Sequence, residues 1–357
     1  MIALITDTHY GTHNDSPIFY NYQEQIFQEK IRPELKRRGV KNIIHLGDTL
    51  DRRKYVNFTT LKFVKDKIYR PLQEDGISIK KIIGNHDCSY KNTNSINSPS
   101  ILFKEFDNIQ IISEPTEDGK YLYLPWINSE NYEKSMNLIR STSASIVFGH
   151  LEIIGFKMMP GTICEEGLSS NDFEHFQNVY SGHFHLKSRI GNIQYLGCPW
   201  ELKITDVDDP KGIYFLDEET DELEFFPTEQ KMFNKLIYDD RYCDEKEFFQ
   251  MFDEDLLASI RNTVVQVYVN HKTQPILFDR FCQYLNRSEA HSVSYSFSDY
   301  KRGEDEPDDG IEFSTDTLEI IRRSINDYDD LIPTEEKKKD LEKLIMNLYV
   351  KALNNND

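Results

Sequence analysis

Short apolar runs alternate with longer amphipathic stretches through the first part of this chain. We expect strands at Ile2–Thr6, Asn42–Leu46, Ile77–Ile83, Tyr121–Leu124, Ser145–Phe148, Val179–Ser181 and Ile193–Leu196. Between the first three strands lie two helix-length segments, Pro17–Arg38 and Thr59–Glu74, which end near Gly39 and Gly76. Strands that alternate with helices of this length predict βαβ units and a layered α/β fold.

The pattern changes after residue 230. Ile213–Leu216 and Leu223–Phe226 flank a polar turn and predict a hairpin that closes a first domain, residues 1–230. Residues 231–300 then read as a small α+β domain. Its predicted helices are Glu245–Ser259 and Pro275–Asn286, and its predicted strands are Thr263–Val269 and Val293–Phe297.

The C-terminal part of the chain is acidic and then amphipathic. Residues 301–333 contain an acidic stretch with Gly and Pro, which predicts a linker. Residues 334–357 begin with a capping Thr and carry apolar side chains at helical spacing, among them Leu341, Leu344, Ile345 and Leu348. Such a stripe predicts a helix that docks in a partner's groove, and the alternative is that it folds back on its own domain.

Composition narrows the classes of function. The 357 residues carry 42 basic and 61 acidic side chains, a net charge of −19, which argues against binding nucleic acid through a generally basic surface. A phosphate substrate would need local positive charge, and bound cations are its simplest source. The five cysteines are scattered without a CxxC pair, so we expect a reducing cytoplasm. We find neither a membrane-spanning run nor a signal peptide.

Five short segments place polar side chains in a turn directly after a predicted strand. They are Asp7-Thr8-His9, Gly47-Asp48-Thr49-Leu50-Asp51, Gly84-Asn85-His86-Asp87, Gly149-His150 and Gly182-His183-Phe184-His185. In α/β sheets such turns converge beyond the carboxyl ends of the strands. The mixture of carboxylate, amide and imidazole suits two divalent cations, with the Asp48 carboxylate as the bridging group. Ligation by nitrogen and oxygen without thiolate favours manganese, magnesium or iron over structural zinc.

The remaining polar residues have an ordinary structural interpretation. We expect the other five histidines, His13, His45, His175, His271 and His291, to lie in the core or on the surface. We also expect Cys88 and Cys198 to pack rather than to bind metal. The basic turn Arg52-Arg53-Lys54 could contact a nucleic-acid backbone, and a solvated turn is the alternative.

In their order along the chain, the five motifs resemble those of the calcineurin-like metallophosphoesterases. Within that superfamily the chain resembles the nuclease subunit of SbcCD-type double-strand-break repair nuclease–ATPase complexes, and the recombination endonuclease subunits of tailed phages in particular. The segments Gly149–Phe156 and Gly197–Trp200 carry this narrower resemblance. It implies a two-sheet sandwich flanked by helices, a small capping domain over the site and a C-terminal helical tail.

The resemblance also assigns roles to residues. It implies one metal held by Asp7, His9, Asp48 and His185, and a second held by Asp48, Asn85, His150 and His183. His86 would stand beside the scissile phosphate and assist the leaving oxygen. Asp51 would orient His86, as an Asp does in the related phosphatases, although many nucleases of the family carry His there.

The function implied is a two-metal DNA nuclease, with manganese expected and magnesium as the alternative metal. Its partners would be DNA and an SMC-like, ABC-type coiled-coil ATPase that binds the C-terminal helix. By analogy the nuclease forms a homodimer within a heterotetramer, with helices 17–38 and 59–74 as the candidate dimer surface. For a phage protein this places it in the host cytoplasm. The alternative is a small-molecule or cyclic-nucleotide phosphodiesterase of the same superfamily.

Overall fold

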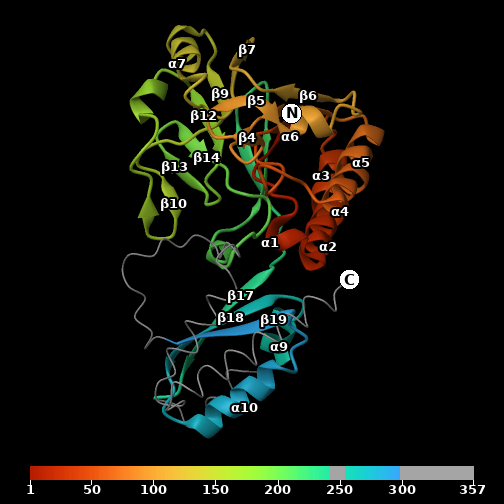
Figure 1. Ribbon diagram of the computed structural model, residues 1–357, viewed down its shortest axis with the longest axis vertical. Helices are drawn as coiled ribbons and strands as arrows, with labels where there is room; N and C mark the ends of the chain where they lie inside the picture. Colours follow the sequence, from red (N-terminus) through yellow and green to blue (C-terminus); the bar gives the residue numbers. More distant parts are fainter. Residues whose placement is uncertain (242–253, 298–357) are drawn as a thin grey trace, which may run out of the picture. The chain divides into compact units, whose positions relative to one another are not determined.

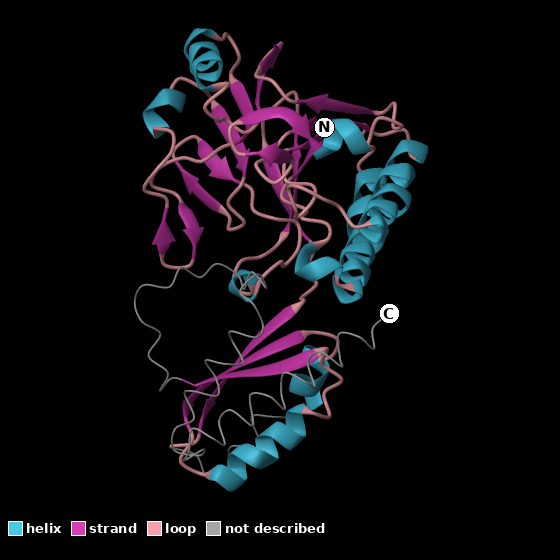
Figure 2. Cartoon of the chain, viewed as in Figure 1, coloured by secondary structure: helices cyan, strands magenta, loops and turns pink. Residues whose placement is uncertain are grey.

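Two six-stranded sheets packed face to face form the main body of the computed structural model (Figure 1). The structure describes residues 1–241 and 254–297. The first sheet has the strand order β16-β15-β1-β2-β3-β6 and the second β13-β14-β12-β9-β8-β7. The predicted layered α/β sandwich is confirmed, and Figure 2 shows the helices on the outside of the strands.

The first sheet is built on three parallel strands, β1 (Ile2–Ile5), β2 (Asn42–His45) and β3 (Ser78–Ile82). Its other strands are β6 (Ile109–Ile112), β15 (Gly212–Leu216) and β16 (Leu223–Pro227). The last two pair antiparallel, which confirms the predicted hairpin. The second sheet contains β7 (Thr116–Asp118), β8 (Tyr121–Leu124), β9 (Ile146–His150), β12 (Asn178–Gly182), β13 (Ser188–Ile190) and β14 (Ile193–Tyr195).

Three apolar layers hold these elements together. Between the sheets pack side chains such as Leu4, Ile44, Phe148 and Tyr180, all buried. The other face of the first sheet is covered by the long helices, and the other face of the second by α7 (Tyr132–Ser141) and neighbouring loops. Burying both faces explains why the parallel strands read as continuous apolar runs.

The two predicted long helices are each interrupted by a π-helical segment. The first runs α2 (Pro17–Ile26), π segment Phe27–Ile31 and α3 (Arg32–Arg37). The second runs α4 (Phe58–Phe63), π segment Val64–Tyr69 and α5 (Arg70–Glu74). An Arg-Pro pair follows each π segment.

Proline explains this irregularity. Its ring crowds the carbonyl four residues earlier and it has no N–H to offer that oxygen, so the helix widens ahead of it. In the second helix the carbonyl left without a donor by Pro71 is that of Lys67. Gln28 Nε2 of the first helix donates to this oxygen at 2.7 Å and so links the two helices.

The α+β module contains a parallel sheet in the order β17-β18-β19. Its strands are β17 (Phe233–Asp239), β18 (Val264–His271) and β19 (Ser292–Phe297), and its helices are α9 (Glu254–Ile260) and α10 (Pro275–Leu285). The sequence pattern missed β17. The predicted helix Glu245–Ser259 lies partly outside the described residues, and the predicted linker and C-terminal helix, with Leu341, Leu344, Ile345 and Leu348, lie wholly outside them.

Short elements complete the described chain. They are α1 (Thr12–Asp15), hairpin β4 (Cys88–Tyr90) and β5 (Thr93–Asn97), α6 (Ser98–Leu102), hairpin β10 (Lys157–Met159) and β11 (Thr162–Ile163), and 3-10 turns Ser170–Phe173 and Ile204–Asp206. Among the described helices, none has the length and apolar character needed to cross a membrane.

Candidate metal centre

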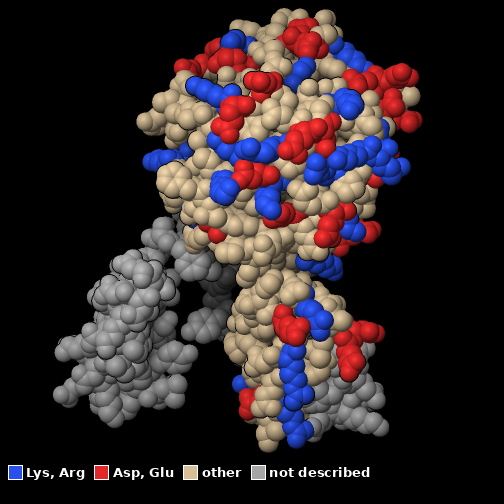
Figure 3. Space-filling model, turned by 90° about the vertical axis from the view of Figure 1, so that its right-hand side faces the viewer, with Lys and Arg blue, Asp and Glu red and all other residues tan. Residues whose placement is uncertain are grey.

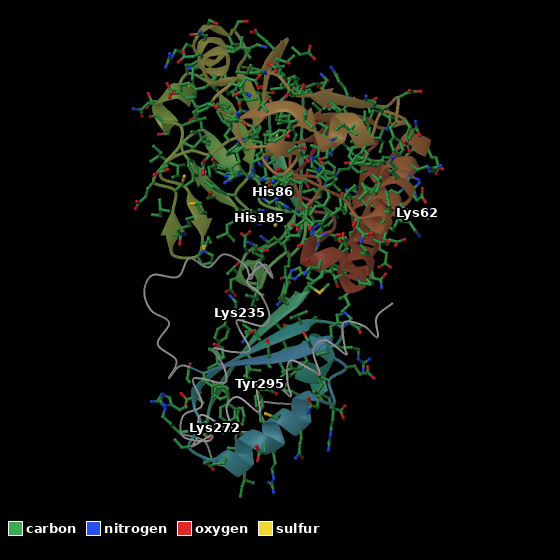
Figure 4. The ribbon with its side chains drawn as sticks, viewed as in Figure 1. Lys62, His86, His185, Lys235, Lys272 and Tyr295 are labelled. Carbon is green, nitrogen blue, oxygen red and sulfur yellow. The ribbon has the colours of Figure 1, made fainter. Side chains whose placement is uncertain are left out.

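The side chains of the five motifs meet where strands of both sheets end. Asp7 and His9 follow β1, Asp48 follows β2, and Asn85 follows β3 of the first sheet. His150 ends β9 and His183 follows β12 of the second sheet. Figure 4 labels His86 and His185, which both make ring contacts with His9 at a centroid distance of 4.8 Å. The structure therefore brings together side chains that are far apart in the sequence.

Asp7, His9 and His185 form a first group whose potential ligand atoms all lie within 4.8 Å of one another. The Nε2 atoms of His9 and His185 are 3.1 Å apart, and each faces Asp7 Oδ1, at 3.8 and 4.0 Å. Two ring nitrogens and a carboxylate oxygen this close together are a mixed nitrogen and oxygen donor set that suits a divalent cation.

Asp48, His150 and His183 form a second group of the same kind. The side-chain amide of Asn85 joins it, with Oδ1 2.9 Å from His150 Nε2 and 3.0 Å from His183 Nδ1. The same end of the amide lies 3.2 Å from Asp48 Oδ2, while its opposite end lies 3.0 Å from Arg53 Nη2. An amide oxygen among a carboxylate and ring nitrogens makes poor hydrogen bonds, but these atoms are good ligands for a divalent cation.

Asp48 connects the two groups. Its Oδ2 lies 3.6 Å from His9 Nε2 of the first group and 3.4 Å from His150 Nε2 of the second. Its Oδ1 accepts a hydrogen bond from the backbone N–H of His86 at 2.8 Å, which fixes the orientation of the carboxylate. The arrangement fits two cations that share one carboxylate.

Four residues of these groups have backbone angles that side chains rarely adopt. The φ angles are 50° at Asp7, 41° at His9, 53° at Asp48 and 92° at His183. Each such residue costs on the order of 1–3 kcal/mol, and the surrounding structure must supply that energy. The concentration of strain in one place is typical of a functional site.

Glycines allow the motifs to approach one another closely. Gly47 has φ +102°, and a side chain there would collide with the ring of His150 and with the Gly84 backbone. A Cβ atom on Gly84 would in turn collide with the backbone and carboxylate of Asp48. The Gly-Asp and Gly-Asn pairs of the sequence are therefore a steric requirement of the site.

The carboxylates of the site favour the charged form of two of its imidazoles, those of His9 and His150. Burial alone would lower the pKa of His9, but the nearby carboxylates of Asp51 and Asp7 outweigh it and raise that pKa to about 10. Burial also opposes the charge of His150, yet the Asp48 carboxylate raises its pKa to about 9. These raised pKa values show that the buried carboxylates favour a positive charge beside them. A bound divalent cation would supply that charge, so the donor set fits a metal.

Neighbouring groups orient two of the imidazoles. Nδ1 of His150 donates to the carbonyl of Leu46 at 2.7 Å, which leaves Nε2 to face Asp48. Nε2 of His183 faces Glu152 Oε1 at 3.8 Å, and Nδ1 faces Asn85. Holding one ring nitrogen in this way selects the tautomer whose other nitrogen can bind a metal.

His86 lies beside the groups with a different set of contacts. Its Nδ1 lies 2.5 Å from the backbone carbonyl of Asp51 and donates to it, which leaves Nε2 free for substrate. Burial lowers the pKa of His86 below its ordinary value. The Asp51 carboxylate instead faces His9 Nδ1 at 3.5 Å. Asp51 thus holds His86 through its main chain, which the sequence did not indicate.

Sequence reasoning missed Asp87, which fastens two of the motifs together. Its buried carboxylate accepts hydrogen bonds from the backbone N–H groups of Asp48 at 2.9 Å, Thr49 at 3.0 Å and Gly84 at 3.0 Å. Lys81, also fully buried, donates to the Thr49 hydroxyl at 2.5 Å. The Gly-Asn-His-Asp sequence contains Asp87, but only the fold shows what it contacts.

Lys211 and Trp200 hold the backbone next to residues of the first group. The sequence predicted neither contact. Lys211 Nζ donates to the carbonyl of His185 at 2.8 Å and pairs with Asp206 at 3.2 Å and Asp209 at 3.0 Å. Trp200 Nε1 donates to the carbonyl of Thr8, between the two motif residues Asp7 and His9, at 3.1 Å. Lys211 lies in no motif, and the Gly197–Trp200 segment did not indicate what Trp200 contacts, because both residues act through contacts distant in sequence.

The three basic residues after the second motif differ in their contacts. Arg52 pairs with Asp15 at 2.6 Å and stacks over the ring of Tyr55. Arg53 reaches the Asn85 amide, and Lys54 is exposed. Figure 3 shows basic and acidic side chains intermixed on the face that carries helices α2 to α5. The basic side chains on this face are therefore not gathered into one patch.

Four of the residues that were expected to lie outside the site have structural contacts. His13 stacks on Phe19 at a centroid distance of 4.1 Å, and its Nε2 bonds to the carbonyl of Leu202. His45 is buried against Thr8. Cys88 and Cys198 are buried, and burial raises the pKa of the Cys88 thiol to about 12.

Comparison with known proteins adds an independent line of argument. The model of the calcineurin-like phosphoesterase family matches residues 1–187. Exonuclease subunit 1 of enterobacteria phage T4 is 29% identical over 360 residues, covering 98% of this chain and 99% of that protein. Among solved structures, GAP50, the anchor in the inner membrane complex of Plasmodium, is 11% identical with a TM-score of 0.36, covering 64% of this chain and 89% of that one.

The family match contains all five motifs, and it ends just beyond the Gly-His-Phe-His turn at His185. Members of this family hydrolyse phosphoesters with divalent metals, and both ligand groups found here lie within the matched residues. The chain belongs to the calcineurin-like phosphoesterase family.

Proposed function

We propose that this protein is a DNA nuclease that hydrolyses phosphodiester bonds with two divalent metal ions. The observation that carries the proposal is the position of Asp48 Oδ2 between His9 Nε2 and His150 Nε2, which joins two ligand groups into one centre. The similarity to an exonuclease subunit along nearly the whole chain supports a nucleic acid as the substrate, and we propose DNA.

In this proposal Asp7, His9, Asp48 and His185 hold one ion, and Asp48, Asn85, His150 and His183 hold the other. When bound, the ions would neutralise the phosphate and make water a better nucleophile near neutral pH. We propose manganese as the metal, with magnesium as the alternative, because the ligands are nitrogen and oxygen atoms.

His86 would act on the leaving oxygen. Its Nδ1–H donates to the Asp51 carbonyl, so the imidazolium form is the one that carries a second proton, on Nε2, and can give it to the substrate. The negative charge of a phosphate beside the ring would favour that form. Hydrolysis adds water across the bond between phosphorus and the 3′ oxygen, and the proton from Nε2 completes the 3′ hydroxyl. A positioned imidazole typically contributes about 10²–10⁴-fold to such a step.

Arg53 and Lys54 are the basic residues best placed to contact the DNA backbone. Arg53 lies beside Asn85 of the second group, and Lys54 is exposed next to it in sequence. Arg52 is engaged by Asp15 and Asn14, so we assign it the role of holding this turn in place. A local basic turn suits a substrate phosphate better than the acidic chain as a whole does.

We propose the domain roles, the partner and the dimer by analogy with the nuclease subunits that the chain resembles. Residues 1–230 would form the nuclease domain and residues 231–300 the cap that shapes DNA entry. Residues 301–333 would be a linker, and 334–357 a helix that binds an SMC-like ATPase. A homodimer through helices 17–38 and 59–74, within a heterotetramer, would act in double-strand-break processing and recombination, in the host cytoplasm if a phage encodes it.

The test compares two substrates. Plasmid or hairpin DNA should be cleaved in the presence of manganese, and His86→Ala should reduce that cleavage while leaving the bound metal unchanged. Hydrolysis of bis-p-nitrophenyl phosphate without any DNA cleavage would instead support the small-molecule phosphodiesterase. Deleting residues 334–357 should abolish co-purification of the ATPase but not hydrolysis of the small diester.

A further inference from the structure

Trp126 lies against the second ligand group, although no motif includes it. It follows β8 and Pro125, and its indole ring is partly exposed. The ring centroid lies 5.1 Å from that of His183 at an interplanar angle of 44°, and 6.1 Å from that of His150 at 70°. An aromatic side chain thus forms part of the wall of the centre.

The backbone of Trp126 is held from three sides. Its N–H donates to the carbonyl of Ile83 at 2.8 Å. Its carbonyl accepts from Asn94 Nδ2 at 2.9 Å and from Asn131 Nδ2 at 3.0 Å. Both asparagines are buried, and Asn94 belongs to the hairpin that follows His86. Buried polar side chains therefore hold the backbone that carries this partly exposed aromatic ring.

A third buried asparagine completes this support. Asn128 Nδ2 donates to Asn94 Oδ1 at 2.9 Å, and its backbone N–H donates to Asn131 Oδ1 at 2.8 Å. Cross-linked in this way, the two loops beside the centre cannot shift independently. Rigid support of this kind is what a ligand-binding side chain requires.

The indole N–H itself is not committed to the fold. Within the described residues, Trp126 Nε1 has no hydrogen-bond partner, whereas the other tryptophan, Trp200, donates its N–H to Thr8. Trp200 is therefore a buried structural tryptophan. Trp126 instead has an indole N–H without a partner among the described residues and a partly exposed ring.

We propose that Trp126 is a stacking platform for the nucleobase next to the scissile phosphate. The proposal rests on the proposed nuclease function and adds a binding subsite to it. A phosphate held between the ligand groups places its flanking nucleoside within reach of the ring, because the ring contacts the ligands themselves. Stacking accepts every base, so it supplies affinity without sequence preference and without positive charge.

The experiment uses the full-length chain loaded with manganese and two matched oligonucleotides. One carries a natural base beside the scissile phosphate, and the other carries an abasic tetrahydrofuran residue at the same place. The unmodified protein should show a KM about 5- to 160-fold higher for the abasic oligonucleotide, the range that corresponds to about 1–3 kcal/mol of stacking.

Trp126→Leu removes the aromatic face and should bring the ratio of the two KM values to about one. Trp126→Phe keeps a smaller ring and should retain part of the ratio. Tyr132→Leu replaces an aromatic residue on α7 that is 44% exposed, and it should leave the ratio unchanged.

Two outcomes overturn the platform while leaving the nuclease in place. One is an equal KM for both oligonucleotides in the unmodified protein, and the other is a ratio that Trp126→Leu does not lower. If the unmodified protein cleaves neither oligonucleotide but hydrolyses a small diester, the proposed function fails and the platform fails with it.

Discussion

The imidazole of His86 is held by the main chain of Asp51, whose carbonyl oxygen lies 2.5 Å from Nδ1. The Asp51 carboxylate points elsewhere, to His9 Nδ1 at 3.5 Å. Asp51 therefore orients His86, as the resemblance implies, but through its main-chain carbonyl. Its carboxylate instead favours positive charge on the His9 ring.

This relationship predicts different outcomes for two substitutions. Asp51→Asn preserves the carbonyl, so cleavage should fall by less than about 10-fold. His86→Ala removes the proton-carrying ring and should lower kcat by about 10²–10⁴-fold. Steady-state kinetics on DNA, with the bound metal measured in parallel, provide the comparison. Equal losses for the two variants would mean that the Asp51 carboxylate, and not its carbonyl, positions His86.

Substituting Gly47 tests whether the first sheet must approach His150 of the second sheet as closely as the structure shows. Gly47→Ala adds a methyl group where φ is +102° and the His150 ring already lies, so metal content should fall and DNA cleavage with it. Gly39→Ala is the matched control, because φ there is +66° but nothing lies within 4 Å of the new methyl group. It should cost about 1 kcal/mol of stability and keep the metal. Unchanged metal content in Gly47→Ala would contradict the geometry.

Lys211 should contribute strongly to stability. Its side chain is 3% exposed beside Asp206 at 3% and Asp209 at 16%, so Lys211→Met leaves buried carboxylates without their cation. We expect a loss of about 3–5 kcal/mol in the free energy of unfolding, measured with urea.

Lys235→Met is the control for Lys211. Lys235 pairs with Asp208, which is 81% exposed, and the loss should be about 1 kcal/mol or less. Similar values for the two variants would show that the buried Lys211 network contributes no more than a surface ion pair.

His45 should make stability fall in mild acid. Burial, and then the charge of Lys81, hold its pKa well below 6.5, so the folded state keeps this ring neutral while the unfolded chain takes up a proton. Stability from this group is present above pH 6.5 and is lost as pH falls below it. Relative to His45→Gln, the free energy of unfolding should decrease by about 1.4 kcal/mol per pH unit between pH 6 and 5. A pH-independent difference would contradict a neutral buried His45.

The sequence predicted those parts of the site that lie in short local motifs. Asp7 and Asp48 each follow an apolar strand of the first sheet, so their convergence follows from the parallel pairing of β1 and β2. His150 ends a strand of the second sheet, and its approach to Asp48 depends also on how the two sheets pack. Asp87, Lys211 and Trp126 could not be assigned in this way, because their roles depend on contacts with distant segments. Lys81 illustrates the limit, since the adjacent Lys80 and Lys81 look alike in sequence while only Lys81 is fully buried.

The fold shows the same division. The predicted strands followed from apolar runs, and the two long helices from their amphipathic pattern. Other strands, such as β6, β7 and β13, were not predicted. The π segments before Pro33 and Pro71 were not predicted, because proline also permits a kink or a helix end. Strand β17 was missed because the exposed Ile237 lies between Leu236 and the buried Tyr238, which breaks the alternation of apolar and polar positions.

The most direct test of the two-metal centre is anomalous scattering from crystals of the full-length protein soaked in manganese. The account predicts two peaks, both next to Asp48, one near Asp7 and His185 and the other near Asn85 and His183. A single peak at saturating manganese, or two peaks that do not share Asp48, would contradict it.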